Sequence, residues 1–126
     1  MNRVELKKKL HSVMSQLLTE KKFISPVDVL LGTGILSVKD LDEWRFGRVP
    51  YLEKVCRANL SAMSFIIKEI KSYADGAGLK PSQTGYVRWG TKGKKIPLRF
   101  SKSGDAKIEA AYATHYVVRT RGAANE

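Results

Sequence analysis

The sequence predicts an α+β fold, in which about four N-terminal helices carry a small C-terminal antiparallel hairpin or three-stranded sheet. Two observations predict it. Apolar residues recur at helical spacing through residues 1–76, whereas the segment that follows is rich in glycine and contains short alternating runs typical of strands. We expect a single domain, 1–126, with a helical part (1–76), a basic β-rich part (77–121) and a frayed tail (122–126).

The first helix is predicted from an apolar stripe near the N-terminus. Leu6, Leu10, Met14 and Leu17 recur at spacings of three and four residues, so they share one face of a helix. His11 lies at the edge of this stripe. A partly buried imidazole with a hydrogen-bond partner is the favoured interpretation there, over a ligand or an acid-base group.

Two short helices follow, and each begins at a serine that can cap its first turn. Ser25 followed by Pro26 predicts the first start, and Ser37 predicts the second, because serine side chains accept hydrogen bonds from free amides there. Glycines at 32–34 and at Gly47 should end the two helices. The second helix carries three carboxylates, which repel phosphates, so we interpret the pair as scaffold rather than a DNA-reading helix-turn-helix.

The strongest periodicity in the chain predicts one long central helix, from Pro50 to residue 74, that ends at Asp75 and Gly76. Cys56 falls on the apolar stripe of this helix. A buried structural thiol is favoured over a reactive one, since the sequence places no histidine or helix N-terminus nearby to lower the pKa of the thiol.

The β-rich part is predicted to start after a loop of residues 76–85. Residues 86–89 and 96–100 are the two candidate strands, and the glycine-bearing segment between them suits a hairpin connection. Pro97 would make the second strand an edge strand or a distorted one. Beyond it, residues 106–114 fit a short helix capped by Asp105, and residues 112–119 equally fit a third strand. The sequence leaves both open.

Charge and composition narrow the class of protein. The net charge of +11 divides into +4 for residues 1–24, zero for residues 25–78 and +7 for residues 79–126. Such asymmetry predicts a polyanionic partner, with simple solubility as the alternative. No stretch is long and apolar enough for a membrane span, and the N-terminus lacks the apolar segment of a secretory signal. The single cysteine excludes an internal disulfide framework. We therefore expect a cytoplasmic protein without a membrane partner.

The basic hairpin is the strongest candidate functional feature. Lysines at a mobile tip reach phosphates, and arginine and aromatic side chains stack on bases. The sequence therefore predicts a non-enzymatic module for DNA or RNA, whose contacts come from Arg88, Lys92, Lys94, Lys95, Arg99, Tyr86 and Trp89. Two alternatives stay open. The lysines would only protect an exposed edge while the aromatics fill the core, or the basic face would bind an acidic protein surface, as in a regulatory domain.

A second basic pair, Arg45 and Arg48, precedes the helix that Pro50 is predicted to open. These guanidinium groups form a possible anion site at that helix N-terminus. Pairing with the nearby carboxylates of Glu43 and Glu53 is the favoured interpretation.

Enzyme motifs are mostly missing. The sequence has no phosphate loop, no dinucleotide fingerprint and no nucleophile elbow. A small nuclease-like hydrolase would have to use His115 as acid or base, together with Asp105 and Glu109. These three residues have no recognised metal-ligand spacing, so we expect neither a metal nor a cofactor, and an enzyme is the less favoured class.

Two segments of the chain carry a resemblance. They are WRFGRVPYLEKV, from Trp44 to Val55, and YVRWG followed by PLRFSKSGD, between Tyr86 and Asp105. They resemble a small family of uncharacterised bacterial proteins, and the similarity covers most of the chain. The resemblance implies a bacterial cytoplasmic protein with its own compact fold, and it implies no activity.

Overall fold

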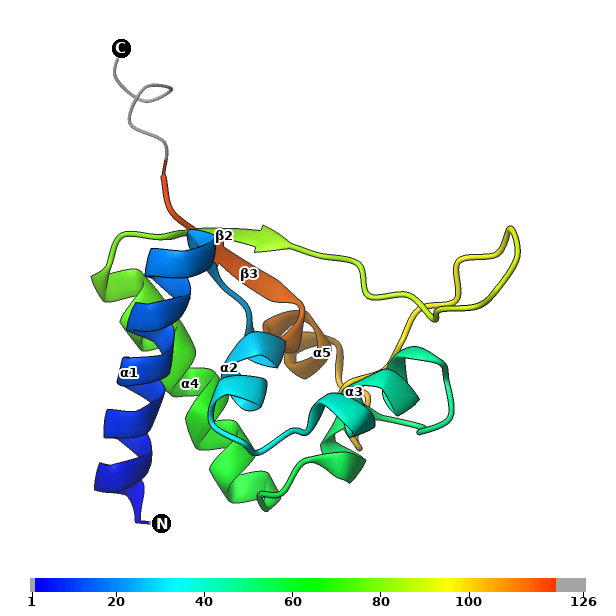
Figure 1. Cartoon of the computed structure of the whole chain (residues 1–126), viewed down its shortest axis with the longest axis horizontal. Helices are drawn as coiled ribbons and strands as arrows, with labels where there is room; N and C mark the ends of the chain where they lie inside the picture. Colours follow the sequence, from blue (N-terminus) through cyan, green and yellow to red (C-terminus); the bar gives the residue numbers. More distant parts are fainter. Residues whose placement is uncertain (1, 120–126) are drawn as a thin grey trace.

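A small sheet lies along one side of the helices in the computed structural model, which describes residues 2–119 (Figure 1). Helix α1 packs along α4 at one end of the molecule, and α3 lies towards the other. The α+β class is confirmed, while the predicted frayed tail, 122–126, lies outside the described residues. The elements are α1 (Arg3–Lys21), β1 (Phe23–Ile24), α2 (Pro26–Gly32), α3 (Val38–Arg45), the 3₁₀ helix η1 (Leu52–Val55), α4 (Leu60–Gly76), β2 (Lys80–Gln83), α5 (Ala106–Tyr112) and β3 (Thr114–Val117).

The sheet has the strand order β1-β3-β2, and both pairings are antiparallel. Its central strand, β3, is the third strand that the sequence left open, and α5 immediately before it is the alternative short helix, so the chain contains both. The predicted loop 76–85 is wrong, because β2 lies within it. All four β2 side chains are exposed and Pro81 is one of them, so this edge strand has no apolar alternation in its sequence.

The predicted helix starts are confirmed by their caps. Ser25 Oγ accepts a hydrogen bond from the amide of Asp28 at 3.1 Å, and Ser37 Oγ accepts one from Asp40 at 3.1 Å. Asp105 caps α5 by accepting from two amides of the first turn. These caps satisfy donors that a helix N-terminus leaves free, which is why short-range spacing was sufficient to find them.

The single long helix predicted from Pro50 is wrong. The chain forms η1, passes through an extended Cys56 and starts α4 only after Asn59, whose side chain accepts from the amide of Ala62 at 2.8 Å. Tertiary hydrogen bonds explain the break. The amides of Leu52 and Glu53 donate to the carbonyls of residues 99 and 100, at 3.1 and 2.9 Å, instead of entering a helix.

The core joins the helical part to the β-rich part. The predicted stripe of α1 is buried together with Met63, Ile66 and Ile70 of α4. Trp44 is fully buried, and its indole N–H donates to the Arg99 carbonyl at 2.8 Å. No helix within residues 2–119 combines the length and apolar character that a membrane crossing requires.

His11 and Cys56 have the structural roles that the sequence favoured. His11 Nε2 lies 2.7 Å from Glu69 Oε2, and its ring meets Tyr73 edge to face at 4.9 Å. Cys56 is half-buried and its Sγ donates to the Leu52 carbonyl at 3.4 Å. Burial raises the pKa of this thiol to about 12, so it stays protonated and unreactive at neutral pH.

Candidate functional site

Residues 86–100, hereafter the basic ribbon, extend away from the helices and return (Figure 1, yellow-green to yellow). The two candidate strands, 86–89 and 96–100, are not regular strands, because one isolated antiparallel bridge, Val87 with Pro97, is all that joins the two arms as β-structure. This agrees with the distortion expected for the second strand from Pro97. The amide of Arg88 donates to the Ile96 carbonyl at 2.8 Å, and that of Leu98 donates to Tyr86 at 2.9 Å. Pro97 lies opposite Val87 between these two bonds, at a position whose amide would point away from the other arm, so its missing amide hydrogen removes no bond between the two arms.

The charged side chains within the segment that contains the ribbon are all of one sign. Residues 76–104 contain seven Lys or Arg and no Asp or Glu. Lys92, Lys94 and Lys95 are exposed at the far end of the ribbon. Within the described part of the chain, no carboxylate forms an ion pair with any of the seven cations. These seven side chains therefore have no ion-pair partner in the described residues, and the two carboxylates that reach the segment, Glu53 and Glu109, bind backbone amides of residues 100–102.

The base of the ribbon is fixed to the C-terminal turn of α3. The amide of Trp89 donates to the Arg45 carbonyl at 2.7 Å, and Arg88 Nε donates to the Phe46 carbonyl at 3.2 Å. Gly47 makes room for this contact. It has φ +76°, and a Cβ at this position would lie 2.4 Å from Arg88 Nε.

Two arginine and three aromatic side chains lie against one another at this base. We call them the Arg–aromatic stack: Arg45, Arg48, Phe46, Trp89 and Tyr86. The Arg48 guanidinium lies 5.0 Å from the Phe46 ring centre, and Phe46 meets Trp89 edge to face at 5.5 Å. The Arg45 guanidinium then lies 4.5 Å from Trp89 and 5.4 Å from Tyr86. Trp89 remains 42% exposed and Phe46 37% exposed. Each cation-π contact positions a ring that solvent still reaches.

Arg45 and Arg48 behave differently from one another. Arg48 forms the predicted ion pair with Glu43, at 2.7 Å. Arg45 forms no ion pair among residues 2–119, and Glu53 instead binds other groups, so that part of the pairing prediction is wrong. Desolvation lowers the pKa of Arg45, and its buried Nε has no hydrogen-bond partner within the described residues. The rings of Trp89 and Tyr86 are its neighbours.

Tyr86 and Arg99, two of the predicted contact residues, are occupied within the fold. The Tyr86 ring is half-buried between Trp44 and Phe100, and its hydroxyl shares a 2.9 Å hydrogen bond with His115 Nε2. The Arg99 guanidinium donates to the Ser101 carbonyl at 2.8 Å and also to the Lys102 carbonyl. Tyr86 and Arg99 therefore support the site through contacts within the fold.

The candidate catalytic residues have separate structural partners. His115 stacks on Phe23 at 5.2 Å and bonds the Tyr86 hydroxyl, and burial lowers the pKa of its imidazole. Asp105 caps α5. Glu109 accepts from the amides of residues 100 and 101, at 2.9 and 2.7 Å. Among residues 2–119, no side-chain hydrogen bond or ion pair joins these three residues to one another, and no group of three metal-ligating side chains occurs there.

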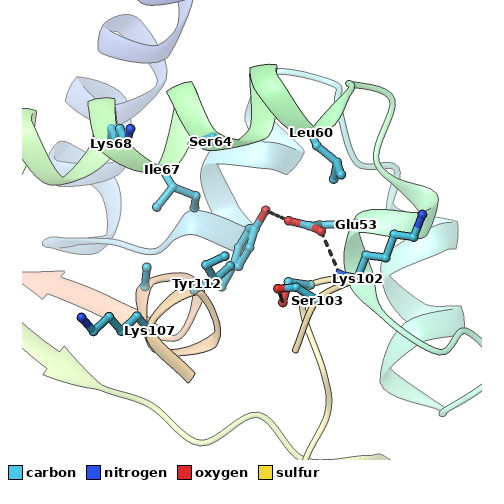
Figure 2. A pocket seen from close by; sticks show the side chains of 12 residues that line it. Glu53, Leu60, Ser64, Ile67, Lys68, Lys102, Ser103, Lys107 and Tyr112 are labelled. Carbon is cyan, nitrogen blue, oxygen red and sulfur yellow. Dashed lines mark hydrogen bonds between the residues drawn. The ribbon is translucent and has the colours of Figure 1, made fainter. Parts of the chain in front are cut away.

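An apolar pocket of about 340 Å³, which sequence reasoning missed, opens between α4, α5 and η1 (Figure 2). Glu53 lies at its inner end, where one carboxylate oxygen accepts from the Tyr112 hydroxyl at 2.6 Å and the other from the Lys102 amide at 2.9 Å. Leu60 and Ile108 are both exposed at its edge. Two stretches distant in sequence, residues 53–68 and 101–112, build this pocket, so no local motif marks it. Its charged rim consists of Lys68, Lys102 and Lys107.

No family model, curated protein or solved structure matches this chain. The family resemblance of residues 44–55 and 86–105 therefore stays a prediction. Those two segments do meet in space, since they supply the two sides of the Arg–aromatic stack.

Proposed function

We propose that this chain is a cytoplasmic nucleic-acid-binding module that contacts phosphates through the basic ribbon. The positive charge of residues 76–104 carries this proposal, because seven cations lie in a segment without a single carboxylate. Lys92, Lys94 and Lys95 are exposed on an arm that projects from the body. Lysines placed in this way neutralise phosphates and so release the counterions that are condensed on a polynucleotide. This favours binding without base discrimination.

The ribbon, rather than the whole basic surface, is the proposed contact. The lysines of α1 lie at the opposite end of the molecule from the ribbon (Figure 1), so the two basic ends do not merge into one face there. A nucleic acid bound at the ribbon would leave α1 free. This separation provides an internal control, since the same number of charges can be reversed at either place.

We infer binding rather than catalysis because the candidate acid-base residues are already engaged. His115, Asp105 and Glu109 each hold a backbone or ring partner. A general base must instead be within reach of a substrate proton. The lowered pKa of His115 has burial as its main cause, which a structural histidine also shows.

The test compares two triple variants that change the net charge equally. We expect Lys92→Glu, Lys94→Glu and Lys95→Glu together to abolish retention of a fluorescent polynucleotide at moderate salt. Lys7→Glu, Lys8→Glu and Lys9→Glu together should retain it. The slope of log affinity against log salt should shrink by about two to three in the ribbon variant at low salt. Unaltered retention in the ribbon variant, or equal loss in both, would refute the proposal.

The apolar pocket favours a second candidate function, binding of an acidic protein segment. Exposed Leu60 and Ile108 would contact an apolar side chain, and the three rim lysines would contact carboxylates around it. Peptides selected on the immobilised protein from a random display library should then be acidic with an apolar anchor. Their binding should be lost in Ile108→Glu and kept in the ribbon variant. Selection of no such sequence would remove this candidate.

A further inference from the structure

We propose that the Arg–aromatic stack makes this module selective for single-stranded nucleic acid, whose unpaired bases stack on Trp89 and Phe46. This inference rests on the proposed function and deepens it. The tip lysines would provide the affinity for phosphates of any polynucleotide. The two rings at the base of the ribbon would decide which polynucleotide is held.

The exposure of these rings is the first step of the argument. The fold buries aromatic side chains where it needs them for packing: Trp44 is fully buried and Phe100 is 3% exposed. Trp89 and Phe46 remain 42% and 37% exposed, although they touch one another at 5.5 Å. Two aromatic rings that touch one another and both stay open to solvent are available to stack on a planar ligand group.

The second step is that the rings are held in place. The Arg45 guanidinium lies over the indole of Trp89 at 4.5 Å, and the Trp89 amide is bonded to the Arg45 carbonyl. Arg48 lies over Phe46 at 5.0 Å and is itself oriented by Glu43. Rings fixed before binding lose little conformational freedom when a base stacks on them. The guanidinium groups also add positive charge beside the two rings.

The third step concerns what a polynucleotide can offer. Bases inside a duplex are already stacked on their neighbours, so a duplex presents phosphates and groove edges but not base faces. A single strand presents both phosphates and faces, and every base has a face, so stacking discriminates strandedness rather than sequence. The combination of exposed rings with a cationic arm is complementary to that chemistry.

The experiment measures binding of poly(dT), poly(rU) and a mixed-sequence DNA duplex to the full chain. We expect both single strands to bind more tightly than the duplex and to quench tryptophan fluorescence, with Trp44 as the buried, unquenched background. Trp89→Ala should lower affinity for the single strands about 5- to 150-fold, with duplex affinity changed less than about twofold. Trp89→Phe should restore most of the loss, because it keeps a ring.

The outcomes separate this inference from the proposed function. Equal binding of single strands and duplex, with no quenching and no effect of Trp89→Ala, would overturn the inference and leave phosphate binding intact. Absence of binding to every polynucleotide at low salt would overturn both. If circular dichroism shows that Trp89→Ala is unfolded, two other measurements test the stacking: the affinity of Phe46→Ala for the single strands, and the quenching of the unmodified protein. A lack of quenching counts against stacking.

Discussion

Glu109 shows how much of this fold depends on one side chain. Its carboxylate accepts from the amides of Phe100 and Ser101, and from the Ser101 hydroxyl at 2.5 Å. It thereby fixes the returning arm of the basic ribbon to α5. Hydrogen bonds to a charged, partly buried group are among the stronger ones, since removal of the carboxylate leaves amide donors without partners.

We expect Glu109→Ala to lower the free energy of unfolding by about 2–3 kcal/mol, as measured by urea denaturation. Glu20→Ala is the matched control, because Glu20 is exposed and, among residues 2–119, accepts only from Gln16 at the surface. The control should change stability by less than about 0.5 kcal/mol. Losses of equal size in the two variants would contradict this account of Glu109.

His115 makes stability depend on pH. Burial lowers the pKa of its imidazole, and the charge of Asp28 opposes this shift more weakly. The unfolded chain therefore takes up a proton more readily than the folded one. The contribution of neutral His115 to the free energy of unfolding is therefore complete above the ordinary histidine pKa of about 6.5. It is lost as the pH falls through and below that value.

We expect the free energy of unfolding to fall between about pH 7.5 and pH 5.5 by more in the unmodified protein than in His115→Gln. Urea denaturation at the two pH values measures both differences. Gln16→Ala, an exposed change that leaves both histidines in place, serves as the control, and it should keep the larger pH dependence. A His115→Gln variant with the full pH dependence would show that another group causes it.

At the scale of elements, the break between η1 and α4 matters most. Residues 50–76 have the periodicity of one helix, yet the chain uses the first part to meet residues 99 and 100. Asn59 then has to start α4 anew, and its side chain caps the first turn. The energy of this cap is local, whereas the break that makes it necessary is caused by a distant segment.

Asn59→Ala should lower the free energy of unfolding by about 1 kcal/mol, since the capped amide at the start of α4 loses its partner. Asn59→Asp keeps an accepting oxygen and should cost little. Thermal and urea denaturation of both variants provide the comparison. If aspartate destabilises as much as alanine, the cap is not the source of the effect.

At the scale of the whole molecule, the body and the basic ribbon have different tasks. The body holds its sheet together through β3, which pairs with β1 on one side and β2 on the other. The tip of the ribbon, residues 90–95, contributes no residue to the buried core. Binding and folding should therefore be separable in this protein.

We expect a variant with residues 90–94 replaced by Asn-Gly, and with Lys95→Ser, to keep its free energy of unfolding within about 1 kcal/mol. Asn-Gly suits a tight hairpin turn, and shortening a loop has a small entropic effect. The variant should lose retention of poly(dT). A destabilisation of several kcal/mol would show that the tip supports the fold, contrary to this division.

The candidate site was only partly predictable. The charge pattern and the tip lysines are properties of the sequence, so the basic ribbon was found without a structure. The Arg–aromatic stack was not, because its two sides are brought together by contacts such as the bond from Arg88 to the Phe46 carbonyl, which spans 42 positions. The pocket depends on Glu53 and Tyr112, which lie 59 positions apart. Contacts at such separations leave no periodic or spacing signal along the chain.

The sequence by itself determined the α+β class, the stripe of α1, the caps at Ser25 and Ser37, and the location of the excess charge. Each of these depends on residues within about one or two helical turns of one another, where hydrogen-bond partners and faces follow from spacing. The tertiary structure alone decided where the predicted long helix breaks and which strand is central. It also decided which aromatic rings stay exposed. Those outcomes depend on backbone groups and side chains that become neighbours only when distant segments pack, so local preference gave way to packing.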